Sequence, residues 1–227
     1  MVLASKIFYL SEKIGLNTIA AKIKDFKILD IQEINGKEYE VGSSISSLEK
    51  IENGLRGKYE ESFILNFKYH DEDMLVPITV ITPFEFIEKE NITYIIIFAK
   101  KNRANRVANF FSTILTAEKN KILEIEISHK TLQKIVEERK EYIKVIFFDN
   151  VKIPGINKLS LYGRNILDTQ QYEEYIKIGK IWYVVLEFSD NIVIGLTRNG
   201  IVTFFSKIIE EDAFKFIEEK ILPLSQV

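Results

Sequence analysis

One apolar pattern occurs twice in this chain, and it restricts the fold more than any other feature. Residues 93–115 (TYIIIFAKKNRANRVANFFSTIL) and residues 200–222 (GIVTFFSKIIEEDAFKFIEEKIL) each begin with a short apolar run. In the first copy, apolar residues then recur from Val107 at i, i+3, i+4, i+7 and i+8, which predicts one apolar helical face. Each copy is therefore predicted to be a strand followed by an amphipathic helix.

The similarity extends backwards from both copies in the same order. Residues 58–80 and 180–197 each have the pattern of two successive strands, and residues 46–58 and 168–180 each have the pattern of a short helix. Glycine tolerates the left-handed geometry that often ends a helix. The candidate C-cap residues are Gly54 or Gly57 in the first copy and Gly179 in the second.

The earliest parts of the two copies also match. Residues 8–28 and 125–145 are both predicted to be β-α-β, with Ser11 and Ser128 placed to cap the helix. Residues 189–191 (SDN) carry hairpin-turn chemistry. The whole chain is thus covered twice by one element order.

We therefore predict an α+β fold built by tandem duplication of a β-α-β-(α)-β-β-β-α unit. Residues 1–116 and 117–227 would be the two repeats, with mainly antiparallel sheets, helices on one side and a pseudo-twofold relation. The 227 residues are 46% hydrophobic, which is ample for a sizeable core in one large domain or two smaller ones.

Composition excludes several classes of site and favours others. The chain has no cysteine, so disulfides, cysteine-ligated metals and thiol nucleophiles are excluded. The longest apolar run, residues 94–99, is far below the roughly 20 residues that span a bilayer. No typical leader follows the start, so we expect a cytoplasmic protein without membrane contact.

Charge and residue bias add two further expectations. The formal net charge is -2, so any contact with nucleic acid must be local. The Lys/Glu-rich, Gln-poor composition favours a thermophilic source, although AT-rich coding gives a similar bias.

The tandem element order resembles the TATA-box-binding protein family. Residues 153–155 (IPG) fall where that family carries an apolar-Pro-Gly step, and residues 185–196 and 210–221 are similar to its strand-turn-strand and closing helix. The likeness covers both halves in element order. It implies two halves packed by pseudo-twofold symmetry, whose joined sheets form one curved surface that binds something long.

The densest basic stretch is residues 100–106 (KKNRANR), at a predicted strand-to-helix junction. Its cations are Lys100, Lys101, Arg103 and Arg106. A helix N-terminus with such charges could bind phosphate or nucleic acid. The alternative is a solvated helix start, which is favoured by the acidic character of the equivalent residues 207–212 (KIIEED).

Aromatic residues raise the choice between a stacking surface and core. Most fall on apolar stripes and are predicted to be core. Tyr162 and Arg164, with Trp182 and Tyr183, are the candidates for an exposed patch that stacks on nucleic-acid bases.

Carboxylates at strand ends give a candidate metal site. Asp149 ends a predicted strand, and Asp30 and Glu33 lie at a comparable place in the first repeat, as in metal-dependent nucleases. The alternative is turn chemistry after a strand. Residues 69–73 (YHDED) could likewise bind a cation or form a solvated hairpin tip.

The pair formed by Ser128 and His129 allows a nucleophile-base interpretation or a simple helix cap. The common nucleotide-binding and hydrolase motifs do not occur, and no cofactor is expected. Our first hypothesis is a non-catalytic binding or scaffold protein. Its partner, nucleic acid or protein, would be held on the joined sheet surface or by homodimerisation through it. The alternative is a metal-dependent, nuclease-like enzyme.

Overall fold

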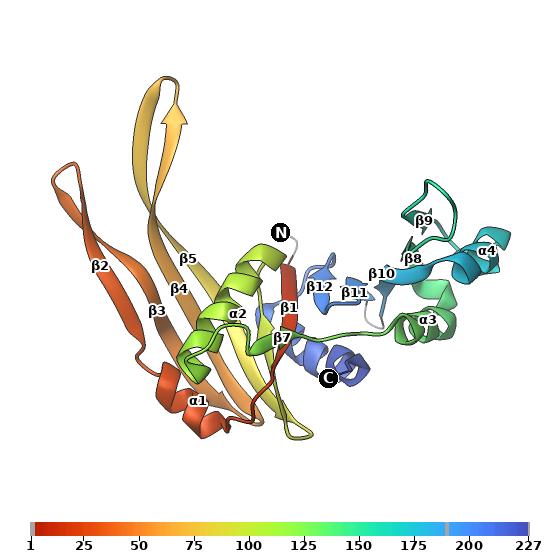
Figure 1. Ribbon diagram of the computed structural model, residues 1–227, viewed down its shortest axis with the longest axis horizontal. Helices are drawn as coiled ribbons and strands as arrows, with labels where there is room; N and C mark the ends of the chain where they lie inside the picture. The colour runs from red at the N-terminus through yellow and green to blue at the C-terminus, as the bar shows by residue number, and fades with distance from the viewer. Residues whose placement is uncertain (1–2, 189–190, 227) are drawn as a thin grey trace. The chain divides into compact units, whose positions relative to one another are not determined.

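The computed structural model describes residues 3–188 and 191–226. These residues form an α+β fold with twelve strands and five α-helices, and the strand pairs described below are antiparallel (Figure 1). The chain divides into two compact units. The N-terminal unit is Tyr9–Leu123, and the C-terminal unit is Met1–Phe8 with Glu124–Val227. The turn predicted at residues 189–191 begins outside the described residues.

The N-terminal unit is a sheet with strand order β2-β3-β4-β5-β6 and two helices. Its strands are β2 (Lys27–Ile34), β3 (Lys37–Ile51), β4 (Gly54–Tyr69), β5 (Glu72–Lys89) and β6 (Ile92–Ile97). Its helices are α1 (Leu16–Ile23) and α2 (Lys101–Thr116).

Helix α2 forms where the sequence predicts it. Val107, Phe111 and Leu115 repeat every four residues and are buried, so they give the helix one apolar face. Phe111 packs edge-on against Phe84 and Phe86 of β5, at centroid distances of 4.7 and 5.2 Å. This aromatic cluster fixes α2 on one face of the sheet.

The helix predicted over residues 46–58 is wrong. Residues 46–51 end β3 and residues 54–58 begin β4, with a tight turn between them. A Cβ added to Gly54 would lie 2.0 Å from the backbone oxygen of Phe86, and one added to Gly57 would lie 2.6 Å from the backbone oxygen of Ser47. These glycines therefore permit close backbone approach in the sheet and do not cap a helix.

The other predicted caps have mixed outcomes. The Ser128 side chain accepts a hydrogen bond from the Thr131 amide and caps α3, as predicted. Ser11 does not cap α1, which begins after Gly15; its hydroxyl donates to the Lys121 carbonyl. Gly179 ends α4 as predicted, but in extended and not left-handed geometry.

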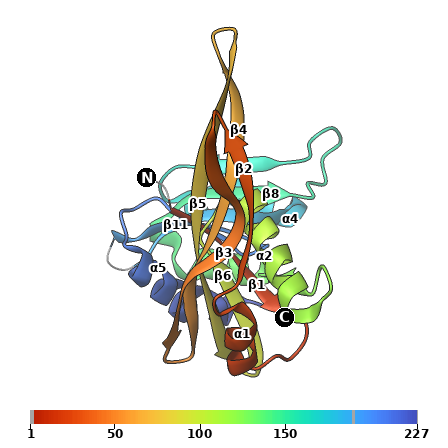
Figure 2. The same cartoon turned by 90° about the vertical axis from the view of Figure 1, so that its left-hand side faces the viewer.

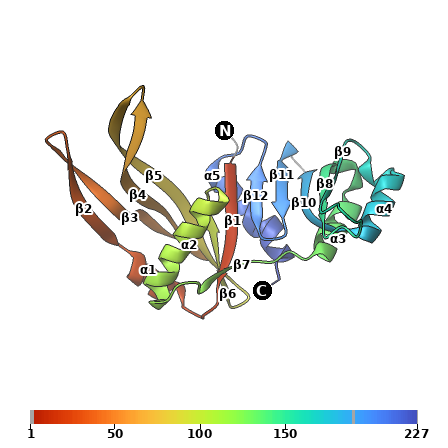
Figure 3. The same cartoon turned by 45° about the horizontal axis from the view of Figure 1, so that its top comes forward.

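The C-terminal unit has strand order β1-β12-β11-β10-β8-β9, with short β7 beside β1 (Figure 3). Its strands are β1 (Leu3–Leu10), β8 (Ile143–Asp149), β9 (Leu159–Tyr162), β10 (Lys180–Glu187), β11 (Val193–Thr197) and β12 (Ile201–Phe204). The boundary between the two units falls after Phe8 within β1 and after Leu123 within β7 (Ile122–Glu124). Its α-helices are α3 (His129–Glu138), α4 (Gln170–Ile178) and α5 (Glu210–Phe216).

Helix α5 continues into a π-helical turn, Ile217–Ile221, and then a 3-10 turn, Leu222–Leu224. Two further 3-10 turns are Lys140–Tyr142 and Ile166–Asp168. Among the described residues, none of the helices combines the length and apolarity needed to cross a membrane.

The two units do not share one strand order. In the N-terminal unit β3 lies between β2 and β4, whereas in the C-terminal unit β8 lies between β9 and β10. Helix α4 lies between β9 and β10 in the C-terminal unit, whereas a tight turn joins β3 to β4 in the N-terminal unit. The tandem duplication is therefore not confirmed.

Candidate interaction surface

Strands β4 and β5 extend beyond their neighbours as a two-stranded ribbon. They pair without a register shift from Gly54 and Ile87 to Tyr69 and Glu72. Pairing of β3 with β4 begins at Ser62, and pairing of β5 with β6 begins at Phe84. Residues 63–69 and 72–78 thus project from the sheet, where β4 and β5 pair only with each other, as Figure 2 shows. We call them the β4–β5 ribbon.

One face of this ribbon is apolar. Side chains alternate between faces along each strand, and directly paired residues share a face. The pairs Phe63–Ile78, Leu65–Val76 and Phe67–Met74 therefore lie one above another, with Tyr69 opposite Glu72 at the end. We call this set the apolar ladder. It consists of Phe63, Leu65, Phe67, Tyr69, Met74, Val76 and Ile78.

The ladder continues the core face of the N-terminal unit. Tyr59 lies on the same face of β4, is 4% exposed, and packs against Phe110 of α2. Its burial raises the pKa of its hydroxyl, which bonds to the Ser43 hydroxyl at 2.8 Å. Four residues further along β4, Phe63 is 36% exposed, and Tyr69 is 60% exposed. An apolar surface that is covered by α2 at its base is therefore open to solvent further out.

Arg103 marks the base of the ladder. Its guanidinium donates to Glu61 Oε2 at 2.9 Å, to Thr82 Oγ1 at 2.6 Å and to the Val80 carbonyl at 2.9 Å. Glu61 and Val80 are paired across the strands, next to the Phe63–Ile78 pair. The first turn of α2 is thus fastened to the sheet where the ladder begins.

The predicted basic segment separates into two roles. Arg103 is committed to these internal contacts, with its side chain 16% exposed. Lys100, Lys101 and Arg106 are exposed around the start of α2, and Arg106 lies 3.7 Å from Glu61. Three of the four predicted phosphate-binding cations therefore form an exposed basic group, which we call the basic base.

The far end of the ladder is acidic. His70 and Asp71 form the turn predicted as a hairpin tip, with His70 at φ 54°. Asp71, Glu72 and Asp73 are exposed. Glu72 shares the ladder face with Tyr69, whereas Asp73 lies on the other face opposite Lys68. The two motifs flagged in the sequence thus lie at opposite ends of one apolar surface.

The opposite face of the ribbon is mixed. It carries the pairs Ile64–Pro77, Asn66–Leu75 and Lys68–Asp73, and the Ser62–Thr79 pair lies on the same face at the base of the ribbon. The Ser62 and Thr79 hydroxyls bond at 2.9 Å. This contrast identifies the ladder as the face of the ribbon that is suited to packing against another apolar surface.

The free edge of β5 is unsuited to pairing with another strand. The Pro83 carbonyl accepts from the Phe98 amide, so Pro83 directs its backbone groups away from β4. In the regular register Pro77 has the same orientation, and proline has no N–H to offer at that edge. The free edge of β5 is therefore a poor template for an added strand.

In the C-terminal unit, the predicted aromatic patch is divided. Tyr162 on β9 is 86% exposed, and Arg164 in the following turn is also exposed. Trp182 is half-buried against Phe147, at 5.8 Å between ring centroids, and is covered by the Lys158 ammonium at 4.8 Å. Trp182 is therefore packed into the sheet surface.

The predicted metal-binding carboxylates do not come together within one unit. Asp149 of the C-terminal unit forms an ion pair with Arg198. Asp30 and Glu33 are exposed on β2 of the N-terminal unit. In residues 3–188 and 191–226, no three His, Asp or Glu side chains are grouped closely enough to hold a metal ion.

His129 serves as a backbone acceptor. Its Nδ1 accepts from the Ile181 amide at 2.8 Å, next to the irregularity that leaves Trp182 unpaired between β10 and β8. Burial, helped by the positive charges of Lys180 and Arg198, lowers the pKa of His129. A neutral imidazole therefore joins α3 to β10.

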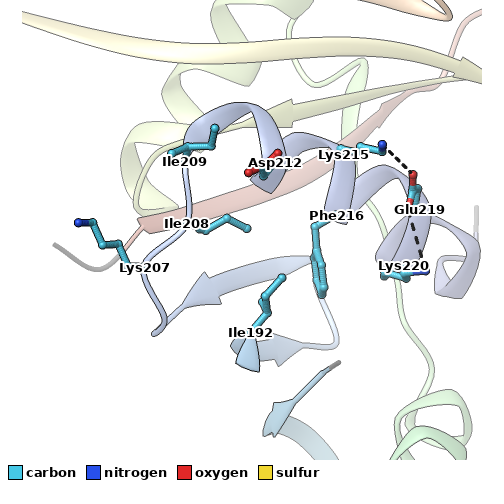
Figure 4. Close-up of a pocket in the computed structure, with 9 residues that line it drawn as sticks. All are labelled: Ile192, Lys207, Ile208, Ile209, Asp212, Lys215, Phe216, Glu219 and Lys220. Atoms are coloured by element: carbon cyan, nitrogen blue, oxygen red, sulfur yellow. Dashed lines mark ion pairs between the residues drawn. The ribbon is translucent and has the colours of Figure 1, made fainter. Parts of the chain in front are cut away.

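An open pocket of about 580 Å³ lies beside α5. Ile192 and Phe216 lie next to each other in its lining (Figure 4). Lys215 and Lys220 both lie near Glu219, at 3.9 and 4.0 Å, so its charges are largely balanced locally. This balance gives no strong preference for a charged ligand.

The ladder is the feature that motif reasoning missed. Its signal is present in the sequence as F-x-L-x-F-x-Y at 63–69 and M-x-V-x-I at 74–78. The pattern is the same for a buried strand, so it does not by itself indicate exposure.

Comparison with known proteins finds no matching protein-family model and no significant match among curated proteins. We therefore base the function on the contacts described above.

Proposed function

We propose that this chain is a non-catalytic binding or scaffold protein whose partner is a protein held on the apolar ladder. The observation that supports this most is the position of the ladder. It is the continuation, without a cover, of the face that α2 buries in the core.

The size of the exposed surface supports an interaction role. Phe63, Leu65, Phe67, Tyr69 and Met74 are each 36–60% exposed. At roughly 200 Å² for a full large side chain, they expose on the order of 400 Å² together. Contiguous patches of that size on a soluble protein are often functional.

The ribbon also gains from a partner. A two-stranded hairpin alone in water is marginally stable, and it gains stability when a further strand or another element packs on its apolar face. Burying the ladder would remove its apolar side chains from water, which stabilises the complex by about 25 cal/mol for each Å² of apolar surface buried. Binding and ordering of the ribbon are thus coupled.

A protein fits this surface better than nucleic acid does. Protein surfaces that bind nucleic acid carry cations along the path of the phosphate backbone, together with exposed aromatic rings that stack on bases. Here the cations Lys100, Lys101 and Arg106 lie at one end, and the other end is acidic. Tyr162 and Arg164 belong to the other compact unit.

The tandem duplication, its likeness to the TATA-box-binding protein family and a thermophilic source stay proposals. The shared element order supports the duplication, whereas the different strand orders of the two units do not. The proposed role of the ladder depends on the N-terminal unit alone and is independent of these proposals.

Site-specific photo-cross-linking tests the proposed function. A benzophenone amino acid is placed at Phe67 on the ladder or, as the matched control, at Lys68 on the opposite face. Each variant is irradiated alone and in an extract of the source cells. We expect protein cross-links, to itself or to another chain, from position 67 and few from position 68. Equal yields from both positions, or none, would contradict a protein-binding ladder.

A further inference from the structure

We infer that the ladder's partner is a second copy of this chain, docked face to face and antiparallel. The acidic tip of each ribbon then meets the basic base of the other. This inference rests on the proposed function and adds the identity and orientation of the partner.

The rungs of the ladder suit a twofold axis. From base to tip they are Glu61–Val80, Phe63–Ile78, Leu65–Val76, Phe67–Met74 and Tyr69–Glu72. A twofold axis can lie between two facing ribbons at the level of the Leu65–Val76 rung. This axis places the rung opposite the same rung of the second chain. The Phe63–Ile78 rung of each chain then faces the apolar Phe67–Met74 rung of the other, and the base of each ladder faces the tip of the other. This is the self-complementarity that a twofold interface requires.

Charge selects the antiparallel orientation. The tip carries exposed Asp71 and Glu72, and the base carries exposed Lys100, Lys101 and Arg106. The start of α2 adds the positive end of a helix dipole beside these cations. A parallel arrangement would place the two acidic tips against each other and the two basic groups against each other. The antiparallel one places each acidic tip against a basic base, twice per dimer.

The dimensions agree with this arrangement. The ladder strand from Ser62 to Tyr69 spans about 26 Å at roughly 3.3 Å per residue. Helix α2 covers the same face up to the Glu61–Val80 rung, where Arg103 holds it. A second ribbon lying on the ladder would therefore end with its tip at the first turn of α2.

The interface is small, so the dimer should be reversible. Two ladders bury roughly 800 Å² of exposed side chain, and their charged ends extend this toward about 1,200 Å², the lower end of specific interfaces. We expect a dissociation constant on the order of micromolar.

Sedimentation velocity of the full chain, from about 1 to 100 µM, measures this constant directly. Leu65 and Leu75 give a matched pair on opposite faces of the ribbon, 41% and 47% exposed. We expect Leu65→Lys to weaken dimerisation at least about tenfold, because it places a charge at the centre of the interface. Leu75→Lys should change it less than about threefold.

A charge-swap series tests the orientation. Glu72→Lys and Arg106→Glu should each weaken the dimer about three- to tenfold, and the two changes in one chain should restore it, because both tip-to-base contacts are then reversed together. Asp73→Lys, on the opposite face, is the control for Glu72→Lys. Circular dichroism confirms that each variant is folded.

The outcomes are distinct. A wild-type chain that stays monomeric at about 100 µM overturns the inference. A dimer that is indifferent to Leu65→Lys, or a charge-swap pair that does not restore it, overturns it as well. If the chain is monomeric but position 67 cross-links to a different protein, the proposed function stands and the self-association fails.

Discussion

Arg103 is expected to contribute strongly to the stability of the N-terminal unit, although it lies in the basic segment that the sequence suggests as a phosphate site. The change considered is Arg103→Met, which keeps most of the apolar stem and removes the guanidinium. It deletes hydrogen bonds to Glu61, to Thr82 and to the Val80 carbonyl. It also leaves the partly buried Glu61 carboxylate with a single, longer ion pair to Arg106.

The magnitude follows from burial. Hydrogen bonds to charged groups contribute about 1.5–3 kcal/mol each when well formed, but they are not additive, and Glu61 stays partly hydrated. We expect a loss of about 3 kcal/mol in the free energy of unfolding of the N-terminal unit. For a chain of this size that corresponds to a fall in Tm of about 6–12 °C.

Arg106→Met is the matched control three residues along the same helix. Its side chain is 67% exposed and lies 3.7 Å from the same Glu61 oxygen. Exposed ion pairs contribute about 0–1 kcal/mol, so the control should lower Tm by less than about 3 °C. Urea and thermal unfolding, followed by circular dichroism in about 0.5 M salt, compare the two without the tip-to-base attraction. Equal effects of the two changes, or a larger effect of Arg106→Met, would refute the structural role of Arg103.

Two further predictions concern His129 and the close-packed glycines. Folding lowers the pKa of His129, so the unfolded chain takes up a proton at a higher pH than the folded chain does. The free energy of unfolding should therefore fall as the pH drops below about 6.5 and through the folded pKa. Denaturant midpoints at neutral and acidic pH should show this fall, and His129→Ala should reduce the dependence of the midpoint on pH. Gly54→Ala should destabilise the chain by several kcal/mol, on the order of 3, because its Cβ would meet the Phe86 carbonyl in the paired strand. Gly15→Ala, which meets nothing within 4 Å, should be neutral to within about 1 kcal/mol. A tolerated Gly54→Ala would contradict the observed register.

Local patterns in the sequence were sufficient where one element decides its own structure. The spacing of Val107 and Phe111 predicts α2, and Ser128 before an amphipathic stretch predicts the cap of α3. Residues 46–58 were predicted wrongly because the reason for Gly54 lies in the backbone of Phe86, which is remote in sequence. The sequence alone does not distinguish a glycine that ends a helix from one that lets a neighbouring strand approach closely.

The site was harder to predict for the same reason. The alternating pattern of the ladder is visible at 63–69, but its exposure depends on where β3 pairing and α2 coverage stop. The role of Arg103 depends on Glu61, 42 residues earlier. Residues 69–73 and 100–106 are both recognisable in the sequence as charged motifs, yet only the fold shows that they lie at the two ends of one apolar surface.

Concentration-dependent hydrogen–deuterium exchange of residues 62–80 tests the ladder account most directly. A ribbon that opens easily when alone should exchange more slowly as a second chain covers it. We expect protection of these residues to rise between about 1 and 100 µM protein, and Leu65→Lys to abolish the rise. The paired strands β8 and β9 of the C-terminal unit serve as the internal reference and should not change. Exchange of residues 62–80 that is the same at all concentrations would contradict the account.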